Sequence, residues 1–217
     1  ALAPLLAELR KETGYGVVLT GHSMGAGVAV ILALRMATRG EPPAACVAFA
    51  CPPVVTDVPW ATKAMAGVEA YIVADDIVPH LSIASVEGLL TRLARIDSCE
   101  AGARTRLAVA AGIEDAPPDM RAAAAAHDVP SGEHAVLEVP AASMVHLPRA
   151  EGAADAAQRP PQPQRQGGGG DLPLARRGDP AAFTARIDVS SVSMTDHLQS
   201  SYVRALAQAA ERAGGVA

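Results

Sequence analysis

Aromatic residues are scarce in this sequence: two Phe, three Tyr and one Trp account for 3% of its 217 residues. Half of the residues are nevertheless hydrophobic, so we expect a core built mainly from Val, Leu, Ile and Ala side chains. A chain of this length is sufficient for one domain with a core of its own. The sequence therefore predicts a single domain over residues 1–217.

Concentrated charge is scarce too. The sequence has 18 Lys and Arg against 23 Asp and Glu, a formal net charge of -5, and they form neither a basic stripe nor a run of like charges. Proteins that bind nucleic acid need such a basic surface to neutralise phosphates. We therefore expect no nucleic-acid partner.

Cysteine is rare, and no hydrophobic run is long. Three cysteines without a C-x-x-C pair predict neither a disulfide framework nor a zinc site, so no metal or other cofactor is expected. The most apolar stretch, residues 28–37, is shorter than the roughly 20 residues needed to cross a bilayer, and the first residues do not have the charged-then-apolar pattern expected of a signal peptide. A helical pattern follows Ala1 almost at once, which predicts a piece of a longer protein. We expect an intracellular location, or membrane association through segments that this chain lacks.

Short apolar strands alternate with helical patterns along the chain. The helical patterns cover residues 2–13, 25–38, 85–96 and 198–212, with a shorter one around 60–66. Ser85 is the expected N-cap of the third helix. The strand patterns at 17–19, 46–50 and 68–73 are short and mostly apolar, as in strands buried on both faces. We therefore predict an α/β fold with a mainly parallel sheet flanked by helices, an α/β-hydrolase whose N-terminal part is missing.

The second half of the chain differs in composition. Residues 98–134 are rich in Ala and are expected to form a variable insert, and residues 150–182 are rich in Gln, Pro and Gly, as in a low-complexity loop. Two more strand patterns cover residues 135–139 and 144–147. Residues 184–189 are expected to pair with them in antiparallel orientation at the sheet edge.

A nucleophile elbow is the strongest motif. The run Gly21-His22-Ser23-Met24-Gly25 matches the pattern G-x-S-x-G and lies between a predicted strand and a predicted helix, the context that this motif requires. A serine in such a sharp turn has a strained backbone, and a Cβ at Gly21 or Gly25 is expected to clash with the strand and helix beside it. Ser23 would then project from the sheet as a nucleophile. The backbone N–H of Met24 would point at the developing oxyanion.

Two adjacent aspartates compete for the role of the acid. A serine nucleophile needs a base and a carboxylate that orients the base, and in this fold they follow in the order Ser, acid, His. Asp76 follows the strand pattern at residues 68–73 and would lie at the sheet edge where Ser23 emerges. Asp75 is the alternative, because two adjacent side chains cannot both face one imidazole. Spacing favours Asp76.

Six histidines are candidates for the base. His197 follows the last strand pattern and directly precedes the last helix, a position from which a loop can place an imidazole over the elbow. His22 lies inside the elbow and is expected to point away from Ser23, and His80 is expected to line the pocket. Three others are expected to face solvent or to serve structural roles: His127, His134 and His146. We therefore predict His197 as the base.

Four segments carry a family resemblance: residues 21–27 (GHSMGAG), 51–55 (CPPVV), 75–82 (DDIVPHLS) and 196–197 (DH). In this order they resemble the motifs of class 3 lipases, the fungal-lipase-like family, and within it most of all those of the sn-1-specific diacylglycerol lipases. In that family the acid is the Asp before Ile-Val-Pro and the base is the late histidine. The resemblance therefore implies Asp76 rather than Asp75, and His197. It extends over residues 1–96, 135–148 and 184–210.

The sequence also departs from that family. The family's lid, early strands and second oxyanion donor lie upstream of the helix that opens this chain, so a complete oxyanion hole is not expected here. Cys51 stands where relatives often have Gly or Ala, and we expect it to be a small buried residue rather than a nucleophile.

The resemblance implies a serine hydrolase that cleaves a carboxylic ester of an acylglycerol, either diacylglycerol or triacylglycerol. The reaction would proceed through an acyl-enzyme with a triad of Ser23, Asp76 and His197, in peripheral contact with a membrane or lipid surface. One alternative keeps the chemistry but has a phospholipid, galactolipid or soluble ester as substrate. Another is a non-catalytic interaction protein that retains the fold.

Overall fold

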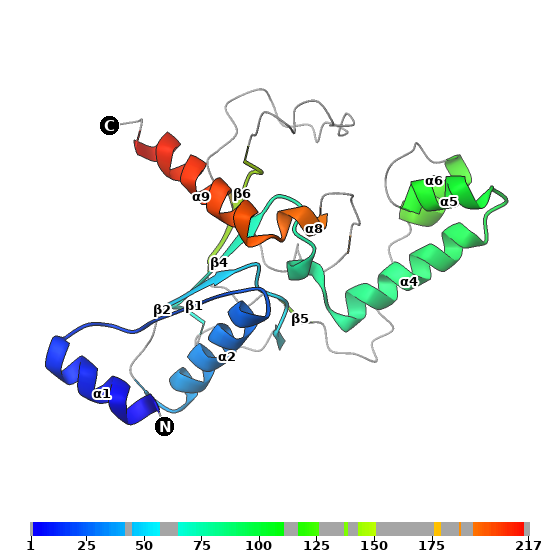
Figure 1. The fold of residues 1–217 in the computed structure, drawn as a ribbon. Coiled ribbons are helices and arrows are strands. Elements are labelled where there is room, and N and C mark those ends of the chain that lie inside the picture. The colour runs from blue at the N-terminus through cyan, green and yellow to red at the C-terminus, as the bar shows by residue number, and fades with distance from the viewer. Residues whose placement is uncertain are drawn as a thin grey trace.

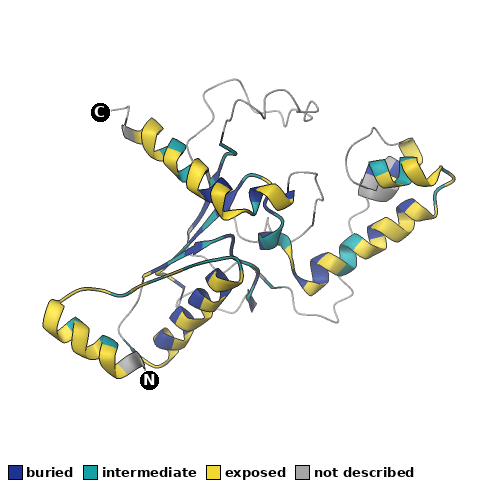
Figure 2. Ribbon diagram, in the orientation of Figure 1, coloured by how far each residue is buried: buried dark blue, intermediate teal, exposed yellow. Residues whose placement is uncertain are grey.

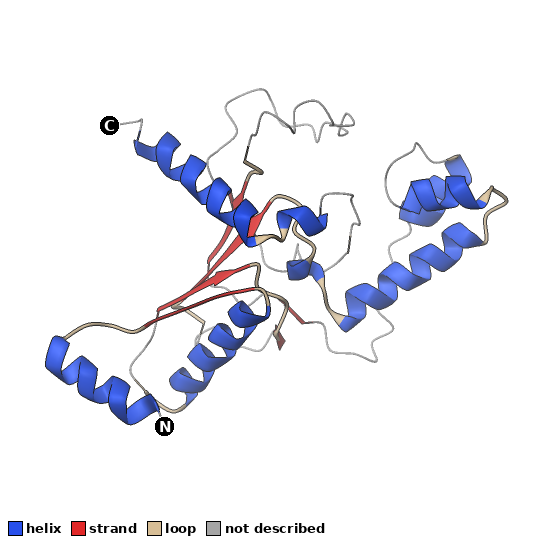
Figure 3. Ribbon diagram, in the orientation of Figure 1, coloured by secondary structure: helices blue, strands red, loops and turns tan. Residues whose placement is uncertain are grey.

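A five-stranded sheet with the order β1-β2-β4-β6-β7 lies at the centre of the computed structural model (Figures 1 and 3). The structure describes residues 2–41, 45–56, 65–110, 117–125, 137–138, 143–150, 176–178, 187 and 193–214. Four strands are parallel: β1 (Val18–His22), β2 (Ala45–Phe49), β4 (Val68–Val73) and β6 (Ser143–Leu147). The antiparallel pairs are β6 with β7 (Arg176–Gly178) and, in a separate small sheet, β3 (Val55–Thr56) with β5 (Leu137–Glu138). The predicted α/β class with a mainly parallel sheet is confirmed.

Helices cover both faces of this sheet. The helix α2 (Met24–Thr38) packs on β1 and β2, and α9 (Gln199–Gly214) packs on β4 and β6 (Figure 1). Consecutive residues of β6 belong to different core clusters: Met144 packs in the cluster of α2, whereas Val145 packs in the cluster that contains Tyr202 of α9. Because successive side chains of a strand point to opposite faces, the two helices lie on opposite sides of the sheet.

Two predictions are wrong at the sheet edges. The strand that follows α1 (Leu2–Thr13) is not buried on both faces: Val18 is 62% exposed, because α2 packs on the face of Leu19 whereas α9 packs on β4 and β6 on the opposite side. The antiparallel edge strand is β7, which lies within the segment 150–182, rather than residues 184–189. Only Ile187 of that expected strand is described, and it is buried outside any strand.

A helical arm leaves the sheet beyond β4 (Figures 1 and 2). Its first helix, α4 (Ile83–Asp97), is capped by Ser82 and not by Ser85 as predicted. The Ser82 hydroxyl accepts the N–H of Ser85 over 3.1 Å and the Ser85 hydroxyl accepts the N–H of Ser82 over 2.8 Å, which forms a capping box. The helices α5 (Ala103–Ala110) and α6 (Pro118–Ala125) lie in the Ala-rich segment 98–134 and pack on α4 through Ile96, Val109 and Met120.

Several expectations fall on residues that the structure does not describe. They concern most of the helical pattern at 60–66, parts of the segment 98–134 and residues 151–175 and 179–182 of the expected loop. Among the described helices, none is both long and apolar enough to cross a membrane.

Candidate active site

Ser23 forms the turn between β1 and α2, with φ 57° and ψ −128°. A positive φ is unfavourable for a residue with a Cβ, so the strained backbone predicted for the elbow is confirmed. The N–H of Ser23 donates to the carbonyl of Phe49 in β2 over 2.9 Å, and its carbonyl accepts the N–H of Ala26 in α2 over 2.9 Å. These bonds from strand and helix hold the strained turn in place.

The two glycines of the elbow are not equivalent. A Cβ at Gly21 would lie 2.2 Å from the carbonyl oxygen of Gly25 and 2.7 Å from the nitrogen of Ala26, so the predicted clash is confirmed there. A Cβ at Gly25 would meet no heavy atom of the described residues within 4 Å, so the prediction is wrong for Gly25. The reason is that Gly25 is exposed at the start of α2. A further close approach occurs at Gly27, where a Cβ would lie 3.3 Å from side-chain atoms of Pro52 and Val54.

The structure brings Ser23, His197 and Asp76 together from three distant parts of the chain. His197 Nε2 lies 3.0 Å from Ser23 Oγ, and His197 Nδ1 lies 3.1 Å and 3.2 Å from the two carboxylate oxygens of Asp76. A carboxylate only accepts hydrogen bonds, so the Nδ1 carries the proton and the Nε2 is free to accept the proton of the Ser23 hydroxyl. This tautomer is the one that a general base requires.

Asp76 is fully buried and accepts two further hydrogen bonds. Its Oδ1 accepts the N–H of Val78 over 2.9 Å, and its Oδ2 accepts the hydroxyl of Tyr202 over 2.6 Å. Burial, and then the negative charge of Asp76, raise the pKa of Tyr202, so this hydroxyl keeps its proton. The carboxylate of Asp75, the alternative acid, instead pairs with Arg149 over 3.2 Å. Asp76 is thus the one of the two that faces His197.

His22 contacts the imidazole of His197, a contact that the sequence did not predict. The two ring centroids are 4.9 Å apart, and His22 Nε2 lies 3.0 Å from the main-chain oxygen of His197. A carbonyl can only accept, so this Nε2 donates. Burial, and then repulsion from His197, lower the pKa of His22, which favours its neutral form. The elbow motif marks this residue, but nothing in the motif indicates its partner.

The other histidines lie apart from this cluster or outside the described residues. His80 is not among the residues that line the pocket, contrary to expectation; its carbonyl accepts the hydroxyl of Ser85. His146 is structural, because its Nε2 donates to the carbonyl of Ala74 over 2.7 Å. His127 and His134 lie outside the described residues. Cys51 is fully buried, and burial raises its pKa to about 12, so it is an inert core thiol as predicted.

The geometry of the elbow and its partners agrees with a comparison against protein families. Residues 2–86 match the model of the class 3 lipase family. The match contains Ser23 and Asp76, whereas His197 lies beyond it. Because His197 lies outside the matched residues, its assignment to the site depends on the distances given above.

Solved structures give short alignments. A triacylglycerol lipase whose catalytic centre is formed by a serine protease triad aligns at 26% identity over 39% of this chain and 34% of its own, with a TM-score of 0.34. A lipase from Rhizopus microsporus var. chinensis aligns at 22% identity over 36% of this chain and 30% of its own, with a TM-score of 0.32. The chain thus spans about a third of the length of these structures. A comparison with curated protein sequences finds no match.

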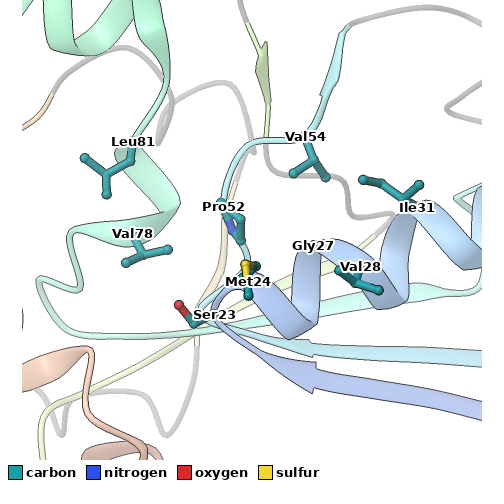
Figure 4. Close-up of a pocket in the computed structure, with 9 residues that line it drawn as sticks. All are labelled: Ser23, Met24, Gly27, Val28, Ile31, Pro52, Val54, Val78 and Leu81. Atoms are coloured by element: carbon teal, nitrogen blue, oxygen red, sulfur yellow. The ribbon is translucent and has the colours of Figure 1, made fainter.

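An apolar pocket opens beside Ser23. Its volume is about 370 Å³, and Figure 4 shows the Ser23 side chain near Val78 and Leu81 on one side, with α2 on the other. The lining residues are Ser23, Met24, Gly27, Val28, Ile31, Pro52, Val54, Val78 and Leu81. Only Ser23 among them has a polar side chain. Such a pocket suits a hydrocarbon chain attached to a group that Ser23 can reach.

The first turn of α2 faces the same space. The N–H groups of Ala26 and Gly27 donate to the carbonyl of Ser23, and those of Met24 and Gly25 precede the first bonds of the helix, at the positive end of its dipole. Met24, directly after Ser23, is the first residue of this helix. Its N–H as an oxyanion donor stays a prediction. Among the described residues, no cluster of His, Cys, Asp or Glu is arranged to hold a metal ion.

Proposed function

We propose that this chain hydrolyses a carboxylic ester of an acylglycerol lipid, with Ser23 as nucleophile, His197 as base and Asp76 as the acid that orients the base. The observation that carries the proposal is the line of hydrogen bonds from Ser23 Oγ to His197 Nε2 over 3.0 Å and from His197 Nδ1 to Asp76 over 3.1 Å. The match of residues 2–86 to class 3 lipases supports the same chemistry.

The first half of the reaction forms an acyl-enzyme. The Ser23 hydroxyl gives its proton to His197 Nε2 while its oxygen attacks the ester carbonyl carbon. The carbonyl oxygen becomes an oxyanion, which the N–H of Met24 would stabilise. The tetrahedral intermediate then collapses, and the C–O bond to the glycerol breaks as His197 gives its proton to the leaving oxygen. Asp76 stabilises the imidazolium through both stages.

The second half releases the fatty acid. His197 takes a proton from a water molecule, whose oxygen attacks the acyl carbon and breaks its bond to Ser23 Oγ. His197 then returns the proton to Ser23. The net reaction consumes one water and yields a fatty acid and the shortened glycerolipid.

We propose that the substrate is diacylglycerol, cleaved at the sn-1 position. Triacylglycerol is the alternative acylglycerol substrate. The motifs that resemble diacylglycerol lipases support this choice, and the apolar pocket beside Ser23 supports a long acyl chain. We also propose peripheral contact with a membrane or lipid surface. Pocket residues with high exposure support it: Met24 is 79% exposed, Val28 60% and Leu81 41%.

The test compares the chain with Ser23→Ala, Asp76→Asn and the control Ser98→Ala. Ser98 is an exposed serine at the end of α4, remote from the elbow. We expect turnover of long-chain diacylglycerol to vanish in Ser23→Ala, to fall about 10⁴-fold in Asp76→Asn and to stay unchanged in the control. A fluorophosphonate probe should label Ser23.

The outcomes separate the alternatives. A preference for phosphatidylcholine, galactolipid or a short acyl ester over diacylglycerol would overturn the substrate assignment while keeping the chemistry. A chain that neither turns over any ester of this panel nor reacts with the probe at Ser23 would overturn the enzymatic proposal and favour an interaction protein.

A further inference from the structure

An aspartate directly precedes each of the two residues that complete the proposed triad, Asp76 and His197. One arginine, Arg149, binds both of these preceding aspartates. Asp75 precedes Asp76 after β4, and Asp196 precedes His197 at the end of α8 (Ser193–Asp196). Arg149 follows β6, which lies beside β4 in the sheet. The arginine therefore stands where the segments carrying the acid and the base meet.

The contacts form a closed network. Arg149 Nε donates to Asp196 Oδ1 over 2.7 Å, and its Nη2 donates both to Asp196 Oδ2 and, over 3.2 Å, to Asp75 Oδ2. Asp196 Oδ2 also accepts the main-chain N–H of Asp75 over 3.0 Å. The network thus joins the main chain next to Asp76 with the residue next to His197.

The burial of Asp196 makes the arginine necessary. Asp196 is 1% exposed, and a buried carboxylate is strongly unfavourable unless an opposite charge and hydrogen bonds compensate it. The two parallel hydrogen bonds from the guanidinium supply that compensation and also hold the carboxylate at a defined angle. A lysine ammonium in its place has no such planar pair of donors.

We propose that Arg149 is a positioning residue for ester hydrolysis, which holds the segment of Asp76 and the segment of His197 in register through Asp75 and Asp196. The inference rests on the function proposed above. Asp196 and His197 share one peptide bond, so a shift of the Asp196 carboxylate moves the imidazole relative to Ser23. A displacement of about 1 Å in a reacting group lowers a rate about 100-fold.

The effect should fall on turnover and not on substrate binding. Arg149 is not among the residues that line the pocket, and its described contacts are with Asp75 and Asp196. An ester should therefore bind to a variant of Arg149 as it binds to the unchanged chain. A general loss of folding would instead lower the amount of active protein and leave the kcat of the remaining fraction unchanged.

The experiment measures kcat, KM and the active-site concentration, by titration with a fluorophosphonate, for Arg149→Ala, Arg149→Lys and Arg106→Ala. Arg106 is the matched control, because it forms an ion pair of 3.0 Å with Asp97 on the remote helical arm. We expect kcat per titrated site to fall about 10- to 100-fold in Arg149→Ala, with KM changed less than about twofold. Arg149→Lys should lie between this variant and the unchanged chain, and Arg106→Ala should match the unchanged chain. Added methylguanidinium should restore part of kcat in Arg149→Ala alone.

Unchanged kcat per site in Arg149→Ala, or rescue by methylguanidinium in Arg106→Ala as well, would overturn the inference. If Arg149→Ala does not fold, Arg149→Lys decides, because a kcat equal to that of the unchanged chain overturns the positioning role. Ser23→Ala serves as the blank in all assays. If the unchanged chain shows no more turnover than this blank, the proposed function itself is overturned. If the unchanged chain turns over the ester and the Arg149 variants do so equally well, only the role of Arg149 is overturned.

Discussion

Tyr202 connects the proposed acid Asp76 to the central sheet. Its hydroxyl donates to Asp76 Oδ2 over 2.6 Å and accepts the N–H of Val73, the last residue of β4, over 3.3 Å. The phenol therefore bonds both to the carboxylate and to the end of the strand that carries it. Because Tyr202 is 2% exposed, water cannot replace either bond without a rearrangement of α9.

Replacement of Tyr202 by Phe should weaken both stability and turnover. The variant keeps the ring but leaves the N–H of Val73 and one oxygen of Asp76 without this partner, which costs about 1–3 kcal/mol of unfolding free energy. Turnover should fall about tenfold, the equivalent of about 1.4 kcal/mol, because Asp76 then orients the imidazole less strictly. Urea unfolding and ester kinetics measure the two effects. An unchanged kcat would show that Tyr202 stabilises the fold without orienting Asp76.

Substitution of the two elbow glycines by Ala should have unequal effects on stability. The Cβ of Gly21→Ala would overlap main-chain atoms of Gly25 and Ala26, which cannot move without breaking α2, so we expect a loss of about 3 kcal/mol in unfolding free energy. Gly25→Ala meets open space at a helical position and should change stability by less than about 1 kcal/mol. Chemical denaturation of both variants gives the comparison. Equal destabilisation would contradict the asymmetry.

His22 should make the stability of the fold depend on pH. Burial, and then the nearby His197, lower its pKa below the ordinary value of 6.5, so below pH 6.5 the unfolded state binds the proton more readily than the folded state. The contribution is complete above pH 6.5 and is lost as the pH falls towards the lower pKa of the folded state. His22→Gln keeps an amide donor for the carbonyl of His197 but cannot titrate.

The measurement is the difference in unfolding free energy between the unchanged chain and His22→Gln across pH. We expect this difference to be constant from pH 7.5 to 8.5 and to shift against the unchanged chain as the pH falls below 6.5. A difference that stays flat down to pH 5 would show that His22 titrates alike in the folded and unfolded states.

The buried cysteines should resist alkylation. Burial raises the pKa of Cys46, and burial followed by the neighbouring Cys46 raises that of Cys51 to about 12, while the thiolate is the reactive form. At pH 8 iodoacetamide should therefore modify Cys99, which is partly exposed, and reach Cys46 and Cys51 only after denaturation. Peptide mass spectrometry resolves the three sites. Rapid labelling of Cys51 in the folded chain would contradict this burial.

Much of the fold and of the candidate site could be predicted from local patterns. The helices α1, α2 and α9 and the strands β2, β4 and β6 lie where periodicity and apolar runs indicate. The edge of the sheet is harder to predict. A short apolar run such as that of β1 has the same sequence pattern in an edge strand as in a central strand. The strand β7 lies in a segment whose composition indicates a loop, and only its pairing with β6 makes it a strand.

The sequence by itself determined the strained turn at Ser23 and the need for Gly21, because the atoms involved lie within a few residues of one another. It also indicated the order Ser23, Asp76, His197. Only the tertiary structure decided which side chains meet: His197 lies 174 residues from Ser23 and 121 from Asp76. The tertiary structure also decided the contact of His22 with His197, the hydrogen bond of Tyr202 to Asp76 and the contacts of Arg149 with Asp75 and Asp196. None of these partners carries a sequence signal, because hydrogen bonds between distant segments depend on how the strands and helices pack.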